Sequence, residues 1–175
     1  MRKLFTLLFL FLFSVGLAQT RKDTITGSVD IEYLNSLVLQ ICNERTKSSN
    51  VFKTPTTTTF KCAEYQSSYM AKYSVCTHDN DKVHRGIILP DIRDRVNYFN
   101  KGGQPTSISE ICTFSYFDIG EITYEELANN IMNNYFNSEP HRKTIFVSYP
   151  YGNFSCTLGT YKGGGGVYVT GFFSR

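Results

Sequence analysis

Apolar residues recur every three or four positions in four segments of the chain, and this spacing predicts four helices. The segments cover residues 30–47, 60–73, 90–99 and 123–137. In each segment one face is apolar and the opposite face is polar, so we expect the apolar face to be buried. The expected buried positions are Ile31, Leu34, Val38, Ile41 and Cys42; Phe60, Ala63, Ser67, Met70 and Ala71; Ile92, Val96 and Phe99; and Leu127, Ala128, Ile131, Met132, Tyr135 and Phe136.

The last of these segments carries clear start and stop signals. Thr123 followed three residues later by Glu126 is the signature of a capping box, so a helix should begin there. Ser138 favours a stop, and Pro140 disfavours helix at the residue before it. His141 is therefore predicted just past the end of the helix, held by a turn, where its side chain can face a cleft.

Three segments rich in β-branched and aromatic residues predict strands at 108–116, 154–161 and 167–173. The residues between the last two strands, 162–166, predict a hairpin turn. A phosphate-binding loop would need a helix behind its glycines, and a strand follows here. The order of the elements lacks the alternation of strand and helix that builds a parallel sheet. The sequence therefore predicts an α+β fold in which helices cover an antiparallel sheet.

The first 18 residues have the features of a secretory signal peptide. Arg2 and Lys3 form a basic start, residues 4–13 are a short apolar run, and a small-residue cleavage site ends at Ala18. The apolar run is too short to span a bilayer, and no later segment approaches a spanning length. We expect a secreted or periplasmic protein, cleaved near Ala18.

After cleavage the chain is expected to consist of a flexible polar leader, residues 19–29, and one domain, residues 30–175. Cleavage removes two of the 18 basic residues and none of the 15 acidic ones, so the formal net charge falls to +1. A nearly neutral chain gives no electrostatic reason to bind nucleic acid or an anionic membrane. The expected partner is an extracellular ligand or protein of unknown identity.

Five cysteines in an exported chain allow two disulfide bonds and leave one thiol over. Their spacing matches no zinc motif and includes no C-x-x-C pair, which favours structural bridges or buried thiols over a metal or redox role. Cys112 and Cys156 both lie in predicted strands and are the favoured pair. The five residues are Cys42, Cys62, Cys76, Cys112 and Cys156.

The candidate functional residues are three histidines and one carboxylate: His78, His84, Glu110 and His141. Imidazole and carboxylate groups together suit a divalent metal or a general acid–base pair near neutral pH. From residue type alone, a surface or capping role explains each of them more simply. The sequence contains neither the G-x-S-x-G elbow of serine hydrolases nor the H-E-x-x-H pair of zinc proteases.

Six short motifs follow one another in an order that resembles a known family. They are Asn43-Glu44-Arg45; Tyr69-Met70-Ala71 with His78; Asp94-Arg95; Ser109-Glu110-Ile111; YFNSEPHR at 135–142; and GVYVTGFF at 166–173. Over residues 31–173 the chain is in this way similar to the CAP superfamily (cysteine-rich secretory proteins, antigen 5 and pathogenesis-related proteins) in its compact bacterial secreted form.

The resemblance implies a three-layer α-β-α sandwich in which His78, Glu110 and His141 converge in one cleft. His84 is the alternative for the first histidine. His78 and His141 would then bind a divalent ion such as zinc, with water in an open position. The same groups would equally make a hydrogen-bonded polar cleft without metal.

Two departures from the family pattern concern this cleft. Tyr135 replaces the usual Trp and supplies a smaller aromatic anchor. Many members carry a second cleft glutamate where this chain has Ser138, and the adjacent Glu139 is the candidate substitute. We therefore expect three of the family's four cleft residues here.

The resemblance implies a secreted binding module without catalytic turnover, whose cleft holds a divalent metal or a small ligand. The lack of a nucleophile–base motif agrees with this prediction. The alternative is a secreted metal-dependent hydrolase, either a peptidase or a cell-wall enzyme. In that case metal-bound water would lie at His78 and His141, and Glu110 would be the general base.

Overall fold

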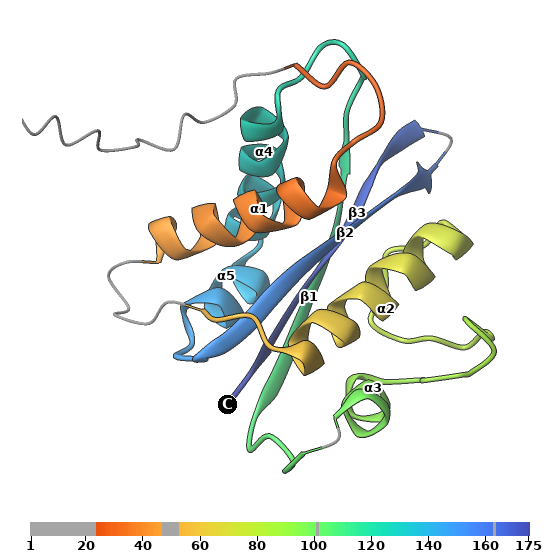
Figure 1. Cartoon of the computed structure of the whole chain (residues 1–175), viewed down its shortest axis with the longest axis vertical. Coiled ribbons are helices and arrows are strands. Elements are labelled where there is room, and N and C mark those ends of the chain that lie inside the picture. The colour runs from red at the N-terminus through yellow and green to blue at the C-terminus, as the bar shows by residue number, and fades with distance from the viewer. Residues whose placement is uncertain (1–23, 47–52, 101, 163) are drawn as a thin grey trace, which may run out of the picture.

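A computed structural model of the chain describes residues 24–46, 53–100, 102–162 and 164–175. Within these residues, five helices pack on a three-stranded antiparallel sheet of order β1-β3-β2 (Figure 1). The prediction of an α+β fold, a three-layer α-β-α sandwich with a central antiparallel sheet, is confirmed. The elements are α1 (Ile31–Arg45), α2 (Thr57–Tyr73), α3 (Ile92–Phe99), β1 (Ile108–Tyr116), α4 (Tyr124–Asn137), α5 (Glu139–Phe146), β2 (Tyr151–Tyr161) and β3 (Gly164–Ser174).

The larger core lies between the sheet and the helices α1 and α4. Side chains alternate across a strand, so every second residue of the central strand β3 faces this side. Three such residues, all fully buried, belong to one cluster with apolar side chains of both helices and with Ile145 of α5. The three are Val167, Val169 and Phe173, and their helical neighbours in the cluster include Leu34, Val38, Leu127, Ile131 and Tyr135.

The opposite face of the sheet is covered by α2 and α3 (Figure 1). Its apolar contacts form two small clusters rather than one large core. One joins Phe172 of β3 to α2 and α3, and the other joins Tyr168 of β3 to Met70 of α2 and Cys112 of β1. Glu110 precedes Cys112 by two residues on β1 and therefore points to this same, less apolar face.

The helix starts follow the capping signals in the sequence. Thr123 and Glu126 form the predicted reciprocal capping box at the start of α4. Thr56 and Thr59 form a second box, and for this reason α2 begins at Thr57, three residues earlier than predicted. The expected burial of Phe60 is wrong, because 43% of this residue is exposed.

The segment after α4 differs from the prediction of a turn. The backbone N–H of Ser138 bonds to the carbonyl of Tyr135, and a new helix, α5, begins at the next residue. Pro140 lies in the first turn of α5, where the missing N–H removes no helical hydrogen bond. His141 is therefore part of a helix rather than of a turn.

The leader expected over residues 19–29 is ordered where it can be described. Ile25 is buried in the larger core, and its backbone bonds to Gly120 and Ile122. Thr24 forms a β-bridge with Thr123, so the described part of this segment is packed rather than flexible. The predicted signal peptide lies outside the described residues. No helix among the residues that the structure describes is long and apolar enough to cross a membrane.

The prediction of disulfide bonds is wrong. All five cysteines lie in the described part of the chain, and all are free thiols. The favoured pair, Cys112 and Cys156, lies on β1 and β2, which are separated by β3. Cys112 is aligned with Thr170 and Cys156 with Val169, which are consecutive residues of β3. The two thiols therefore face opposite sides of the sheet.

The hairpin that joins β2 and β3 is tighter than predicted, because Gly164 to Gly166 already belong to β3. At Gly166 the neighbouring strand and an aromatic ring leave no room for a side chain. A Cβ there would collide with the carbonyl oxygen of Ser115 and would lie 2.6 Å from the ring of Phe114. At Gly165 a Cβ would meet no heavy atom within 4 Å.

Gly166→Ala is expected to lower the free energy of unfolding by about 1–3 kcal/mol, the usual cost of overpacking. Gly165→Ala is the matched control in the same strand and should change stability by less than about 0.5 kcal/mol. Urea denaturation followed by circular dichroism measures both. Equal stability of the two variants would contradict the close approach at Gly166.

Candidate functional site

A buried ion pair joins α3 to β1 on the less apolar face of the sheet. The Nη2 atom of Arg95 donates to Oε1 and Oε2 of Glu110 at 2.8 and 2.9 Å. The side chain of Arg95 is fully buried, and that of Glu110 is only 2% exposed. Neither charge could be buried stably without the other, because an unpaired charge in the interior costs several kcal/mol.

His78, the first predicted histidine, contacts this ion pair. His78 Nδ1 lies 3.0 Å from Oε1 of Glu110, and its side chain is half exposed. Arg95 also donates to the backbone carbonyl of His78, at 3.2 Å. Upstream, the buried side chain of Gln66 donates to the carbonyl of Thr77 at 2.6 Å. Two buried side chains thus fix the backbone that carries His78, while its ring remains accessible from solvent.

Cys112 is a third member of the site. It lies two residues after Glu110 on the same face of β1, and its Sγ is 3.6 Å from His78 Nδ1 and 3.8 Å from Glu110 Oε1. We call His78, Glu110 and Cys112 the His/Glu/Cys cluster; each offers one potential ligand atom, and these atoms lie within 4.8 Å of one another. Burial, together with the Glu110 charge, raises the pKa of the Cys112 thiol well above its usual value.

His141, the second predicted cleft histidine, comes from the first turn of α5. It is half buried, and its ring packs edge-on against Tyr135 with centroids 5.5 Å apart. Burial lowers the pKa of His141, and the positive charge of His78 lowers it further. Its ring nitrogens are outside the His/Glu/Cys cluster, so convergence of all three predicted residues in one cleft stays a prediction.

The alternative first histidine, His84, has a different environment. It is 6% exposed, and its ring contacts the rings of Tyr65 and Tyr69 of α2 edge-on. Nε2 lies 2.9 Å from the hydroxyl of Ser68. His84 is therefore packed against α2, and it is His78 that contacts Glu110.

No second carboxylate reaches the cluster from the end of α4. Glu139, the candidate substitute for the family's second glutamate, pairs with Lys143 at 2.6 Å on the solvent side of α5. Both side chains are more than half exposed. Ser138, where the resemblance to the CAP superfamily would place that glutamate, makes no side-chain capping bond.

Sequence reasoning did not assign Arg95 or Cys112 to the site. Arg95 was visible only as part of the Asp94-Arg95 motif, and nothing in a sequence marks an arginine as fully buried. For Cys112 a signal existed. Period-two alternation along 108–116 puts residue 112 on the same face as Glu110.

The protein is an α-β-α sandwich, and an imidazole, a carboxylate and a thiol lie together on the α2/α3 face of its sheet. This fold is similar to that of an outer surface protein from Borrelia burgdorferi, with a TM-score of 0.58 and 14% sequence identity. The match covers 86% of this chain and 98% of that one. At such low identity the likeness shows a shared fold alone. No protein-family model matches the sequence, and no curated protein matches it either.

The ion pair makes a double-mutant prediction. Arg95→Met leaves a buried carboxylate without its cation, and Glu110→Gln leaves a buried guanidinium without its anion. Each is expected to lower the free energy of unfolding by about 3–5 kcal/mol, whereas Arg95→Met with Glu110→Met should recover most of the loss. Denaturant unfolding measures all three. The exposed Glu139–Lys143 pair is the control, and removing it should cost less than about 1 kcal/mol.

Similar stability of the single and double variants at Arg95 and Glu110 would contradict this account. It would mean that the two side chains do not compensate each other.

His84 predicts a pH dependence of folding. Burial lowers its pKa, and the charges of Arg85 and Lys72 lower it further, so the folded state favours neutral imidazole. The unfolded chain takes up a proton as the pH falls through the ordinary histidine pKa, near 6.5, and the folded chain does so only at lower pH. Stability should therefore be full above that pH and decrease below it.

The measurement is the free energy of unfolding in urea between pH 7.5 and 5. His84→Gln should show a shallower fall than the wild type. His141→Gln removes a second histidine of lowered pKa and should also flatten the curve. A His84→Gln curve parallel to that of the wild type would contradict the prediction.

Proposed function

We propose that this protein is an exported CAP-type binding protein without catalytic turnover, and that the cleft around His78 and Glu110 binds a divalent cation of the zinc type. The His/Glu/Cys cluster is the single observation that carries this proposal. It presents a nitrogen, an oxygen and a sulfur, the three kinds of ligand atom that proteins use for zinc.

The spacing of these atoms supports zinc in particular. With ordinary zinc–ligand bonds of 2.0–2.3 Å, neighbouring ligand atoms of a tetrahedral site lie about 3.3–3.7 Å apart. The three separations in the cluster are 3.0, 3.6 and 3.8 Å. Only small movements of the half-exposed His78 ring are needed for His78, Glu110 and Cys112 to hold the ion together. A bound zinc ion would supply the charge that deprotonates the Cys112 thiol.

The fourth position is proposed for His141 or for a water molecule. Burial and the charge of His78 lower the pKa of His141, which favours the neutral imidazole that binds a metal. Because Glu139 pairs with Lys143 in solvent, a second carboxylate is not proposed as a ligand.

The alternative, a metal-dependent hydrolase with Glu110 as the general base, has less support. Both oxygens of Glu110 already accept hydrogen bonds from Arg95. These charge-assisted bonds stabilise the carboxylate as an anion, which favours binding a cation over accepting a proton from water. A carboxylate held in this way suits binding better than proton transfer.

Export and a location at the cell surface complete the proposal. The basic start, apolar run and small-residue site of residues 1–18 support secretion. The shared fold with a bacterial outer surface protein is consistent with a role outside the cytoplasm.

Zinc titration by calorimetry tests the proposal. The wild type is expected to bind one ion per chain, and His78→Ala and Cys112→Ser should each weaken binding at least about tenfold, or 1.4 kcal/mol. His141→Ala should have a smaller effect. His84→Gln removes a histidine that packs against α2 and is the matched control, for which unchanged affinity is expected.

Equal zinc affinity of the wild type, His78→Ala and Cys112→Ser would refute the metal cleft. Hydrolysis of casein or cell-wall material by the wild type, lost in His78→Ala, would instead favour the hydrolase.

A further inference from the structure

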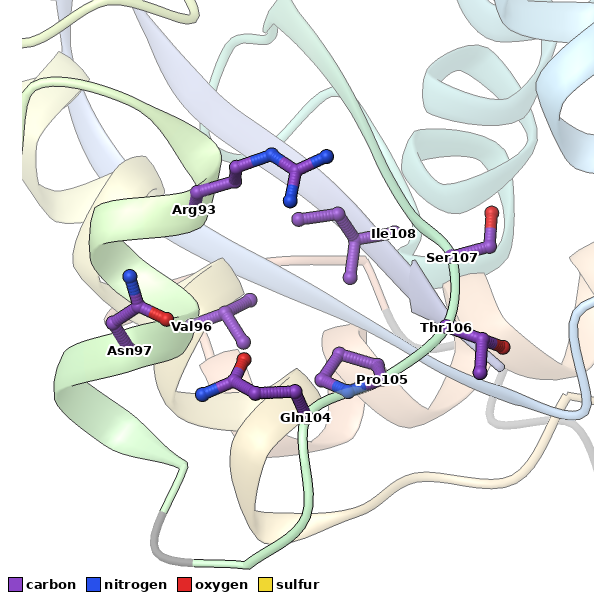
Figure 2. Close-up of a pocket in the computed structure, with 8 residues that line it drawn as sticks. All are labelled: Arg93, Val96, Asn97, Gln104, Pro105, Thr106, Ser107 and Ile108. Atoms are coloured by element: carbon purple, nitrogen blue, oxygen red, sulfur yellow. The ribbon is translucent and has the colours of Figure 1, made fainter.

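Apart from the His/Glu/Cys cluster, the structure has a pocket between α3 and the segment that leads into β1 (Figure 2). We call it the α3 pocket; its volume is about 230 Å³. Ile108 forms part of its lining and lies on the same face of β1 as Glu110, two residues away, or about 7 Å along the strand. The pocket therefore adjoins the His/Glu/Cys cluster without sharing any of its residues.

The walls of the α3 pocket are fixed by the buried ion pair and by two backbone hydrogen bonds. Arg95 ties α3 to β1 through Glu110. On the other wall, the backbone N–H of Thr106 donates to the carbonyl of Arg175, and the N–H of Arg175 donates to the carbonyl of Ser107. Both walls are thus held in place without a ligand, which lowers the cost of binding one.

The lining of the pocket is mostly polar, and its apolar part is small. Val96, Pro105 and Ile108 supply the apolar surface. Figure 2 shows Arg93 reaching from α3 toward Ile108, and Gln104 reaching from the opposite wall toward α3. None of the eight lining residues is acidic.

The guanidinium of Arg93 is available for a ligand. Arg93 is exposed, and no ion pair or side-chain hydrogen bond holds it among the residues that the structure describes. Arg95, on the same helix, differs from Arg93 because it is fully buried and paired with Glu110. The exposed carboxamides of Asn97 and Gln104 add N–H donors elsewhere in the lining.

We propose that the α3 pocket binds a carboxylate carried on a short apolar body. The planar guanidinium of Arg93 matches a carboxylate in a two-point ion pair, and the amide donors of Asn97 and Gln104 complete its hydrogen bonds. The short apolar body lies against the small apolar part of the lining, Pro105 and Ile108. The volume is below the roughly 300–1,000 Å³ of pockets for drug-sized ligands, so the body is limited to a few carbons.

Two sources share this chemistry, the C-terminal residue of a peptide and a free branched organic acid. A single cation suits either monoanion better than a phosphate, which gains from several cationic donors. The inference does not depend on metal binding, because none of the metal-ligand candidates lines the pocket.

Calorimetry with N-acetyl-leucine and its uncharged match N-acetyl-leucinamide tests the inference on the full chain. N-acetyl-leucine is expected to bind, and the amide at least tenfold more weakly. Arg93→Gln should weaken N-acetyl-leucine binding at least tenfold. Arg93→Lys should weaken it by less, because lysine keeps the positive charge but cannot make the two-point contact of a guanidinium. Lys143→Gln removes one exposed positive charge on α5 and is the matched control, for which unchanged binding is expected.

Equal binding of acid and amide, equal binding by the wild type and Arg93→Gln, or no binding of any acid would overturn the inference.

Isovalerate and Gly-Gly-Leu distinguish the two sources. Isovalerate binding as tightly as N-acetyl-leucine would support the site with a free acid as its ligand. Tighter binding of the tripeptide would support it with a peptide C-terminus. Zinc affinity measured on Arg93→Gln should equal that of the wild type, which keeps this test separate from that of the metal cleft.

Discussion

The ion pair between Arg95 and Glu110 joins helix α3 to the central sheet and holds the His78 backbone beside it. One guanidinium nitrogen contacts both oxygens of Glu110 and the backbone carbonyl of His78. The carboxylate oxygen that contacts His78 is also the one that contacts Cys112. Because both charges are buried, the pair has one favourable arrangement, and that arrangement sets the geometry of the His/Glu/Cys cluster.

The two faces of the sheet differ in how apolar their contacts are. The face toward α1 and α4 holds one large apolar cluster, which accounts for most of the hydrophobic stabilisation. The face toward α2 and α3 has only small clusters, and β1 contributes Ile108, Glu110 and Cys112 to it. Because side chains alternate between the two faces of a strand, β1 brings the α3 pocket and the metal-ligand candidates side by side on one face. The buried charge of Glu110 is tolerated there because Arg95 compensates it.

The three histidines show why residue type alone could not assign the site. All three had the same chemistry and similar polar neighbours in the sequence. In the structure His84 is packed on tyrosines of α2, His78 contacts Glu110, and His141 packs on Tyr135 from α5. The cysteines show the same lesson, because Cys112 and Cys156 both lie in strands, as predicted, and yet face opposite sides of the sheet.

The sequence by itself determined helices α1 to α4, the three strands and the fold class, because helix periodicity, capping boxes such as Thr123 with Glu126, and strand composition act over a few residues. It did not predict α5. It also indicated His78 and Glu110 as partners through motif order. Only the tertiary structure decided that Arg95 is buried, that Cys112 joins the cluster and that Glu139 points to solvent. These outcomes depend on contacts between residues far apart in the chain, such as Arg95 with Glu110 and His78 with Cys112. No local pattern encodes which side chains such contacts bury, pair or leave exposed.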